Sequence, residues 1–366
     1  MNTRIQMLFC VAILVSVGAM SVWGRTNRGF VTPFPGGPQG LHGATIARGS
    51  SDAPGDLVNF GTALVNGANY LKAMQADVTE DNAGNGSGLA ESPNDPDDGG
   101  WDWVLTSPPA PFFHTTTASP KNLYGVCGLG LYYAYLRNPG NASYFTAMQD
   151  AATFMVADAG VRDASAMKFL ILFDGLPGVP GTIYQDAARA KFDARITAAG
   201  GTGTALAVLI RDTRGVTQGL PNGIIGWDIG AYVVVAQMLD GRYPASGYDT
   251  KADEMAEVLW QDSFNGNPGL FDVVADAGWD PSYANVNFWW YNLGISGLID
   301  AFNASGSHTS EIPGLVTRLR AGQFSGGAFS FSYGAHATDE DWQSTAYAVM
   351  SLNGLNPATY ATEIAR

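Results

Sequence analysis

The stretch Trp342-Gln-Ser-Thr-Ala346-Tyr347 decides the fold, because three other stretches of the chain repeat its form. Each opens with an aromatic residue, places a small residue four positions later and continues into an apolar segment. A unit that recurs and cannot bury its apolar face alone must stack on its neighbours. The repeats therefore predict helical hairpins that share a core. The other three stretches are Tyr124-Gly-Val-Cys-Gly128-Leu129, Trp227-Asp-Ile-Gly-Ala231-Tyr232 and Trp290-Tyr-Asn-Leu-Gly294-Ile295.

The spacing of these helix entrances indicates the architecture. They lie about 103, 63 and 52 residues apart, which suggests a unit near 50 residues with a degenerate copy around 167–173. Small residues facing a neighbouring helix allow close packing. Inner and outer helices that alternate in a closed ring would account for both the repeat of about 50 residues and the apolar spacing within each helix. We therefore expect an all-α fold, an α/α toroid resembling an α6-α6 barrel, with an open solenoid as the alternative.

Apolar residues at helical spacing place the individual helices. A first helix is expected over 56–76, and a Gly- and Pro-rich irregular stretch follows over 77–121. Asn141, Asp249 and Ser310 are expected to cap helices with their side-chain oxygens. No alternating segment of useful length predicts a strand, apart from 329–333. The later helices are expected over 122–137, 141–158, 163–173, 182–199, 202–213, 227–240, 249–264, 286–303, 309–322 and 341–354.

The N-terminal residues have the form of an export signal. Arg4 precedes an apolar run over 7–20, and small or polar residues follow near Ser21 and Gly24. This pattern predicts a signal peptide over 1–24 and a secreted or cell-surface protein, with a retained N-terminal anchor as the alternative. We expect an extended N-terminal arm over 25–54 and a single toroid domain over 55–366. Removal of the signal would leave Cys127 as the one cysteine, so no intramolecular disulfide is expected.

The charge balance restricts the partners. The chain carries 19 Lys and Arg residues against 33 Asp and Glu residues, a net charge of −14. A field of this sign repels phosphate backbones and anionic lipid surfaces. We therefore expect no nucleic acid partner and, once the signal is cleaved, no membrane partner.

The last repeat supports a family resemblance. Gly326-Gly-Ala-Phe329-Ser-Phe-Ser-Tyr333, followed by Asp341-Trp342-Gln-Ser-Thr-Ala346-Tyr347, resembles the prenyltransferase and squalene-oxidase type repeat of the terpenoid cyclase and protein prenyltransferase superfamily. The stretch Asp98-Gly-Gly-Trp101 is a looser match to the same repeat. The resemblance implies an α/α toroid with a central cavity. It does not imply one activity, since related toroids include cyclases, transferases, lyases and binding domains.

Two special cases of this superfamily leave sequence traces that can be checked. Asp95-Pro96-Asp97-Asp98 matches the D-x-D-D motif of class II cyclases, but Gly99 and Gly100 follow it and predict a turn. A terpenoid-cyclase-like enzyme that uses Asp97 is therefore kept as the weaker alternative. The zinc site of the prenyltransferases needs Asp, Cys and His ligands, and Cys127 has no such partners at matching places, so no metal is expected.

Three loop clusters combine carboxylates with aromatic residues, a composition typical of sugar-binding surfaces. Sugar rings stack on Trp and Tyr, and their hydroxyls bond to Asp, Asn and His. Two carboxylates across a cleft can act as general acid and base. Alternatively, the tryptophans pack between helices and hold them together, and Asp228, Asp280 and Asp341 cap helices. The expected catalytic residues are Asp97, Asp98, Asp102, Asp280, His336 and Asp341, and the expected substrate-binding residues are Trp101, Trp103, Trp227, Tyr283, Trp289, Trp290, Tyr291 and Trp342.

These observations predict an exported glycan-processing enzyme, a polysaccharide hydrolase or lyase, whose partner is a glycan or another extracellular polymer. The alternative from another class is a noncatalytic cell-surface or extracellular binding module on the same fold. No cofactor is expected. Calcium is a further possibility, because the 77–98 loop gathers hard oxygen ligands at Asp77, Glu80, Asp81, Asn82, Asn85, Asp95, Asp97 and Asp98.

Overall fold

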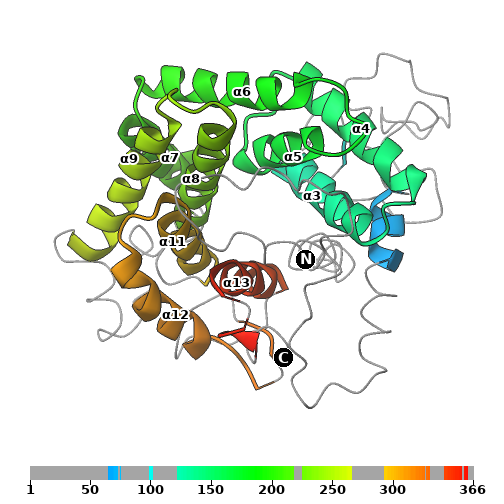
Figure 1. Cartoon of the computed structure of the whole chain (residues 1–366). Helices are drawn as coiled ribbons and strands as arrows, with labels where there is room; N and C mark the ends of the chain where they lie inside the picture. The colour runs from blue at the N-terminus through cyan, green and yellow to red at the C-terminus, as the bar shows by residue number, and fades with distance from the viewer. Residues whose placement is uncertain are drawn as a thin grey trace. The chain divides into compact units, whose positions relative to one another are not determined.

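A computed structural model describes residues 65–72, 75, 99–101, 122–217, 225–265, 292–325, 327–329, 342–356 and 358–361. These residues are all-helical, which confirms the predicted class (Figure 1). Within this part of the chain no strand forms, and Gln323 and Phe329 make only an isolated bridge. The chain divides into two compact units at Lys191 and Phe192, inside one helix. Each unit is described below by itself.

Unit 1 holds a short helix over 65–72 followed by α3 (Asn122–Arg137), α4 (Ala142–Ala157), α5 (Ala164–Asp174) and the first half of α6 (Ile183–Ala199). The helix α3 packs against both α4 and α5. The predicted cap Asn141 is confirmed, since its side chain accepts a hydrogen bond from the backbone N–H of Ser143. Asp163 caps α5 in the same way through the N–H of Ala166.

Unit 2 holds the rest of α6, then α7 (Gly203–Thr217), α8 (Ile225–Arg242), α9 (Tyr248–Trp260) with a π-helical turn (Gln261–Asn265), α11 (Asn292–Ser305), a 3-10 turn η7 (Thr309–Glu311), α12 (Ile312–Ala321) and α13 (Trp342–Leu355). The helix α11 packs between α8 and α13, and α9 and α12 pack against α11 (Figure 1). We call α8, α11 and α13 the inner layer and α7, α9 and α12 the outer layer of this unit. Three of the four aromatic helix entrances, Tyr124, Trp227 and Trp342, lie in the first turn of α3, α8 and α13. The fourth, Trp290, lies outside the described residues.

Five contacts between successive hairpins share one sequence separation. Gly203 donates its N–H to Glu254, Arg211 pairs with Asp262, and Trp260 donates to Glu311. His308 with Glu257 and Asn303 with Gly354 complete the series, and each of these pairs is separated by 51 residues. This separation agrees with the unit near 50 residues that the helix entrances suggest.

The same contacts give the direction of the helices within each layer. The partners advance together along α7 and α9, from Gly203 with Glu254 to Arg211 with Asp262, so these helices run parallel. In the inner layer, Ser351 donates to the carbonyl of Ser296, and Asn303 donates to that of Gly354. The helices α11 and α13 therefore also run parallel, which brings their N-terminal ends to the same end of unit 2.

Glycines set the distance between helices in both units. A Cβ on Gly230 of α8 would lie 2.2 Å from the carbonyl oxygen of Gly297 in α11, and one on Gly297 would lie 2.3 Å from the Cα of Trp227. In unit 1, a Cβ on Gly125 of α3 would lie 2.1 Å from the backbone nitrogen of Ala166 in α5. Glycine inside a helix costs about 1 kcal/mol relative to alanine. The packing that these close approaches allow must offset that cost.

Two predicted caps were wrong. Asp249 lies inside α9, which begins one residue earlier after Gly247, and its carboxylate bonds only to its neighbour Thr250. Ser310 lies inside the 3-10 turn, and Glu311 precedes α12 without a side-chain cap. In both places a tight turn with a left-handed residue, Gly247 or His308, starts the helix instead.

Replacing Gly230 with alanine should destabilise unit 2, because the added methyl overlaps the backbone of Gly297 and the two helices must separate. Overpacking of this kind costs about 1–3 kcal/mol. Gly314 in α12 is the matched control, since a Cβ there meets nothing within 4 Å. Gly314→Ala should stabilise the protein by up to about 1 kcal/mol. Urea unfolding measures both, and an equal effect of the two substitutions would contradict the close approach of α8 to α11.

Candidate functional site

The candidate site lies at the N-terminal ends of the three inner helices of unit 2. The backbone of Trp227, in the first turn of α8, contacts Gly297 of α11. Its indole meets the ring of Tyr347 in α13, with ring centroids 5.0 Å apart and planes at 61°. The N-terminal parts of α8, α11 and α13 therefore converge on one aromatic pair.

The two rings of this pair differ in exposure. Tyr347 is 7 % exposed, whereas Trp227 is half-buried and keeps part of its indole at the surface. Edge-to-face aromatic pairs contribute about 0.5–1.5 kcal/mol beyond the area they bury. The pair thus holds α8 to α13, which is the packing role considered as an alternative for the tryptophans. Because Trp227 is only half-buried, a sugar ring could still stack on its indole.

Asp228 follows Trp227 and is 8 % exposed. It lies in the first turn of α8, where the positive end of the helix dipole stabilises a carboxylate. Its place inside the helix shows that it does not act as an N-cap. Asp228 is therefore a buried carboxylate that directly follows Trp227 in the first turn of α8.

Hydrogen bonds fix the helix that carries Tyr347. Ser351 donates to the carbonyl of Ser296, and both of these serines are buried. Thr345 accepts a hydrogen bond of 2.8 Å from the backbone N–H of Phe329, which ties Phe329 to the first turn of α13. These bonds hold α13 in place against α11, so the position of Tyr347 is set by its own helix.

Trp101 has a different setting from the one expected of a substrate-binding residue. It is 2 % exposed in unit 1, and its indole N–H donates to the carbonyl of Leu71 at 2.8 Å. Gln75 donates to the carbonyl of Gly99 beside it. A ligand could stack on Trp101 only if this indole left the core. The arrangement instead anchors the 65–72 helix.

Most of the predicted site residues lie outside the part of the chain that the structure describes. This holds for every residue of the expected catalytic set and for most aromatics of the expected binding set. Trp342 begins α13, and its side chain is also outside the described set. The residues concerned are Asp97, Asp98, Asp102, Asp280, His336 and Asp341, and Trp103, Tyr283, Trp289, Trp290 and Tyr291.

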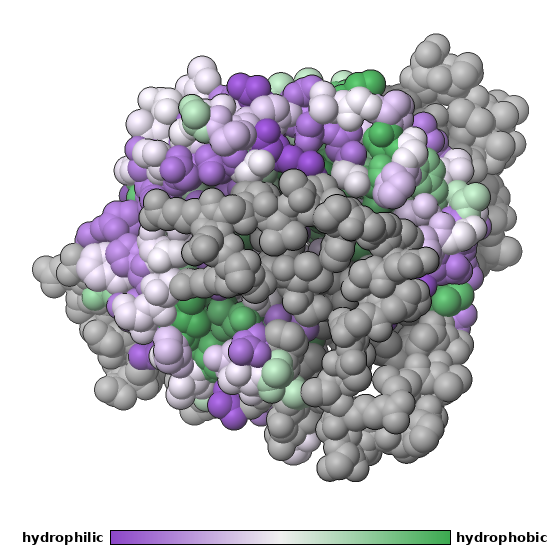
Figure 2. All heavy atoms as spheres, in the orientation of Figure 1, coloured by the Kyte–Doolittle hydropathy of each residue, from purple (hydrophilic) through white to green (hydrophobic). Residues whose placement is uncertain are grey.

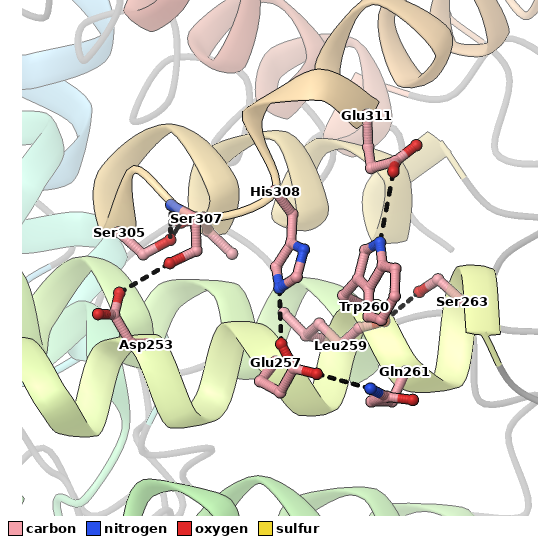
Figure 3. A network of polar contacts seen from close by, with 11 residues as sticks. Asp253, Glu257, Leu259, Trp260, Gln261, Ser263, Ser305, Ser307, His308 and Glu311 are labelled. Carbon is pink, nitrogen blue, oxygen red and sulfur yellow. Dashed lines mark hydrogen bonds and ion pairs between the residues drawn. The ribbon is translucent and has the colours of Figure 1, made fainter.

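A second polar cluster lies in the outer layer, between α9 and the η7 turn (Figure 3). His308 bonds to Glu257 at 2.7 Å and stacks on Trp260 with ring centroids 4.6 Å apart. The Gln261 amide that donates to Glu257 lowers the pKa of this carboxyl, and His308 lowers it further. Trp260 in turn donates to Glu311. The contacts of His308 with Glu257 and of Trp260 with Glu311 join neighbouring hairpins, and the Gln261 bond lies within α9 and its π-helical turn. We therefore assign the cluster a structural role.

Metal and thiol chemistry find little support in the described residues. Across that part of the chain, no group of three or more His, Cys, Asp or Glu side chains is placed to hold a metal ion. Cys127 is buried in α3, and burial raises the pKa of its thiol well above the usual range, which keeps it protonated and unreactive. The 77–98 loop considered for calcium lies outside the described residues. None of the described helices is long and apolar enough to cross a membrane.

Comparisons of the chain with models of protein families, with curated proteins and with solved structures give no match. The site must therefore be interpreted from its own residues.

Sequence reasoning selected Trp227 but did not assign a role to its partner Tyr347. A signal for that partner is present, because an aromatic residue five positions after the entrance recurs as Tyr232 in α8 and Tyr347 in α13. Tyr232 contacts Phe192 of α6 with centroids 6.3 Å apart. The same position of the repeat thus faces different neighbours in the two helices, which sequence alone does not show.

A double-mutant cycle should show coupling between Trp227 and Tyr347. Trp227→Leu and Tyr347→Leu are each expected to lower the free energy of unfolding. The double variant should lose about 0.5–1.5 kcal/mol less than the sum, because the ring contact is lost only once. Thr317, exposed on α12, provides the control, and Trp227→Leu with Thr317→Ala should be additive. Additivity in the Trp227 and Tyr347 cycle would show that the rings do not meet in solution.

Proposed function

We propose that this chain is an exported α/α toroid that processes a glycan, as a polysaccharide hydrolase or lyase. The observation that carries the proposal is the convergence of the inner helices α8, α11 and α13 on the half-buried Trp227 and its partner Tyr347. A half-buried indole suits the apolar face of a sugar ring, and Asp228 adds a carboxylate to the same helix turn.

The arrangement of unit 2 supports the toroid part of the proposal. Its hairpins place successive helices alternately in the inner and outer layer from α8 to α13, and equivalent positions contact one another 51 residues apart. Such stacking of hairpins is the local geometry from which an α/α ring is built. The resemblance of the last repeat to the terpenoid cyclase and protein prenyltransferase superfamily favours the same architecture.

The proposed reaction needs two groups near the bound sugar. In hydrolysis, a carboxylic acid protonates the leaving glycosidic oxygen as its bond to the anomeric carbon breaks. A second carboxylate takes a proton from the water that attacks this carbon, or attacks it directly. Three of the expected acids and bases, Asp280, His336 and Asp341, belong to the segments 266–291 and 330–341, which precede α11 and α13 in the sequence. The whole set from which the groups are drawn is Asp97, Asp98, Asp102, Asp280, His336 and Asp341.

The test is a screen of the full chain against a panel of polysaccharides, with detection of new reducing ends and of unsaturated products. We expect product from at least one glycan. Asp280→Asn or Asp341→Asn should lower the rate by about a hundredfold or more if the residue is the acid or base. Trp227→Leu should weaken glycan retention on a native affinity gel. Retention without product would favour the binding module, and a panel with neither product nor retention would overturn the proposal.

A further inference from the structure

The acceptor sequence for N-linked glycans, Asn-x-Ser or Asn-x-Thr, occurs twice within the described residues. One copy is Asn141-Ala-Ser143, at the turn between α3 and α4, and the other is Asn303-Ala-Ser305, at the C-terminal end of α11. The sugar is bonded to the side-chain nitrogen of the asparagine, so that nitrogen must be free at the surface of the folded protein. The structure therefore distinguishes the two copies. A third copy, at Asn85, lies outside the described residues.

The two polar atoms of the Asn141 side chain have separate surroundings. Its Oδ1 accepts hydrogen bonds from the backbone N–H and the hydroxyl of Ser143, at 3.1 and 2.7 Å, and so caps α4. The orientation of the amide follows from chemistry, because the backbone N–H of Ser143 can only donate. The Nδ2 atom bonds to none of the described residues and is open to solvent. A sugar on Nδ2 would therefore leave the helix cap intact.

The turn that carries Asn141 has room for a glycan. Residues 137–140 before it and residues 142–143 after it are exposed, and Asn141 itself is half-buried. A Cβ on the neighbouring Gly140 would meet no atom within 4 Å, so the space beside the asparagine is open. Figure 2 shows hydrophilic residues among hydrophobic ones on the surface over α4. A bulky and hydrated glycan could extend from this turn without displacing a helix.

Asn303 has the opposite setting. It is half-buried in α11, and its Nδ2 donates to the carbonyl of Gly354 in α13 through a long bond of 3.5 Å. The hydroxyl of Ser305 donates to the carbonyl of Ala301 in the same helix at 2.9 Å. A sugar on this Nδ2 would replace the contact with α13, so α11 and α13 would have to separate. The acceptor sequence is present in both places, but the fold leaves room for a glycan at Asn141 and not at Asn303.

We propose that Asn141 is the attachment site of an N-linked glycan in the exported protein. In the transfer, the Nδ2 of Asn141 forms a bond to the anomeric carbon of an oligosaccharide carried by a lipid diphosphate. The bond from that carbon to the diphosphate oxygen breaks, the lipid diphosphate leaves, and the amide nitrogen loses one proton. This inference goes beyond the proposed function and rests only on its export part, because N-linked glycans mark surface turns of secreted proteins.

The test is secretion of the full chain from eukaryotic cells, followed by mass spectrometry of its peptides. A glycosidase that releases N-linked glycans in isotopically labelled water converts each occupied asparagine to a labelled aspartate, so occupancy is measured site by site. We expect most secreted molecules to carry a glycan at Asn141. The peptide that contains Asn303 should remain unlabelled, because a chain that carries a sugar there cannot pack α11 against α13.

Four variants separate the glycan from the helix cap. Ser143→Thr keeps the acceptor hydroxyl and should retain the glycan, whereas Ser143→Ala should lose it. Asn141→Asp removes Nδ2 and keeps Oδ1, so it should lose the glycan yet melt no lower than the unglycosylated wild type made in bacteria, since Asn and Asp cap helices about equally well. Asn141→Ala removes both atoms and should melt at a lower temperature.

The remaining outcomes contradict the inference in separate ways. Secreted protein without a glycan at Asn141 would overturn it and leave the proposed glycan-processing function standing. Equal occupancy of Asn141 and Asn303 would overturn it too, because the fold would then not distinguish the two sites. A full chain that stays in the cytosol would contradict the export that the proposed function includes, and this inference with it.

Discussion

The packing of this protein depends on helix backbones that touch where a side chain would ordinarily separate them. Gly230 and Gly297 bring α8 against α11, and Gly125 brings α3 against α5. Both contacts lie within or one turn beyond an aromatic helix entrance. Because none of these three glycines can accept a methyl group without displacing backbone atoms, they fix where along their length the helices meet. The register of each hairpin on the next follows from this constraint.

That register explains the candidate site. Once Gly297 lies against the first turn of α8, the indole of Trp227 reaches Tyr347 of α13. The first turns of these helices hold no Lys or Arg, and in the outer layer Arg211 pairs with Asp262. The position of the site thus follows from the contacts between successive repeats.

Much of the fold could be predicted from the sequence because the repeat signals are local. The helix expected over 122–137 agrees with α3, and the Asn141 cap is present as expected. Asp249 misled the prediction because the left-handed Gly247 starts α9 earlier, a backbone feature with no side-chain signature. Trp101 was expected to bind a ligand and lies in the core instead. A tryptophan can stack on a ligand or pack inside the protein, and composition does not distinguish these two roles.

Native-state hydrogen exchange tests the central claim, that glycine contacts unite the inner helices of unit 2 into its most stable part. If it is correct, the amides of α8 and α11 exchange more slowly than those of α9 and α12, and α8 and α11 open together in one cooperative step. Exchange of α11 that is as fast as that of α12, or that occurs independently of α8, would contradict the account.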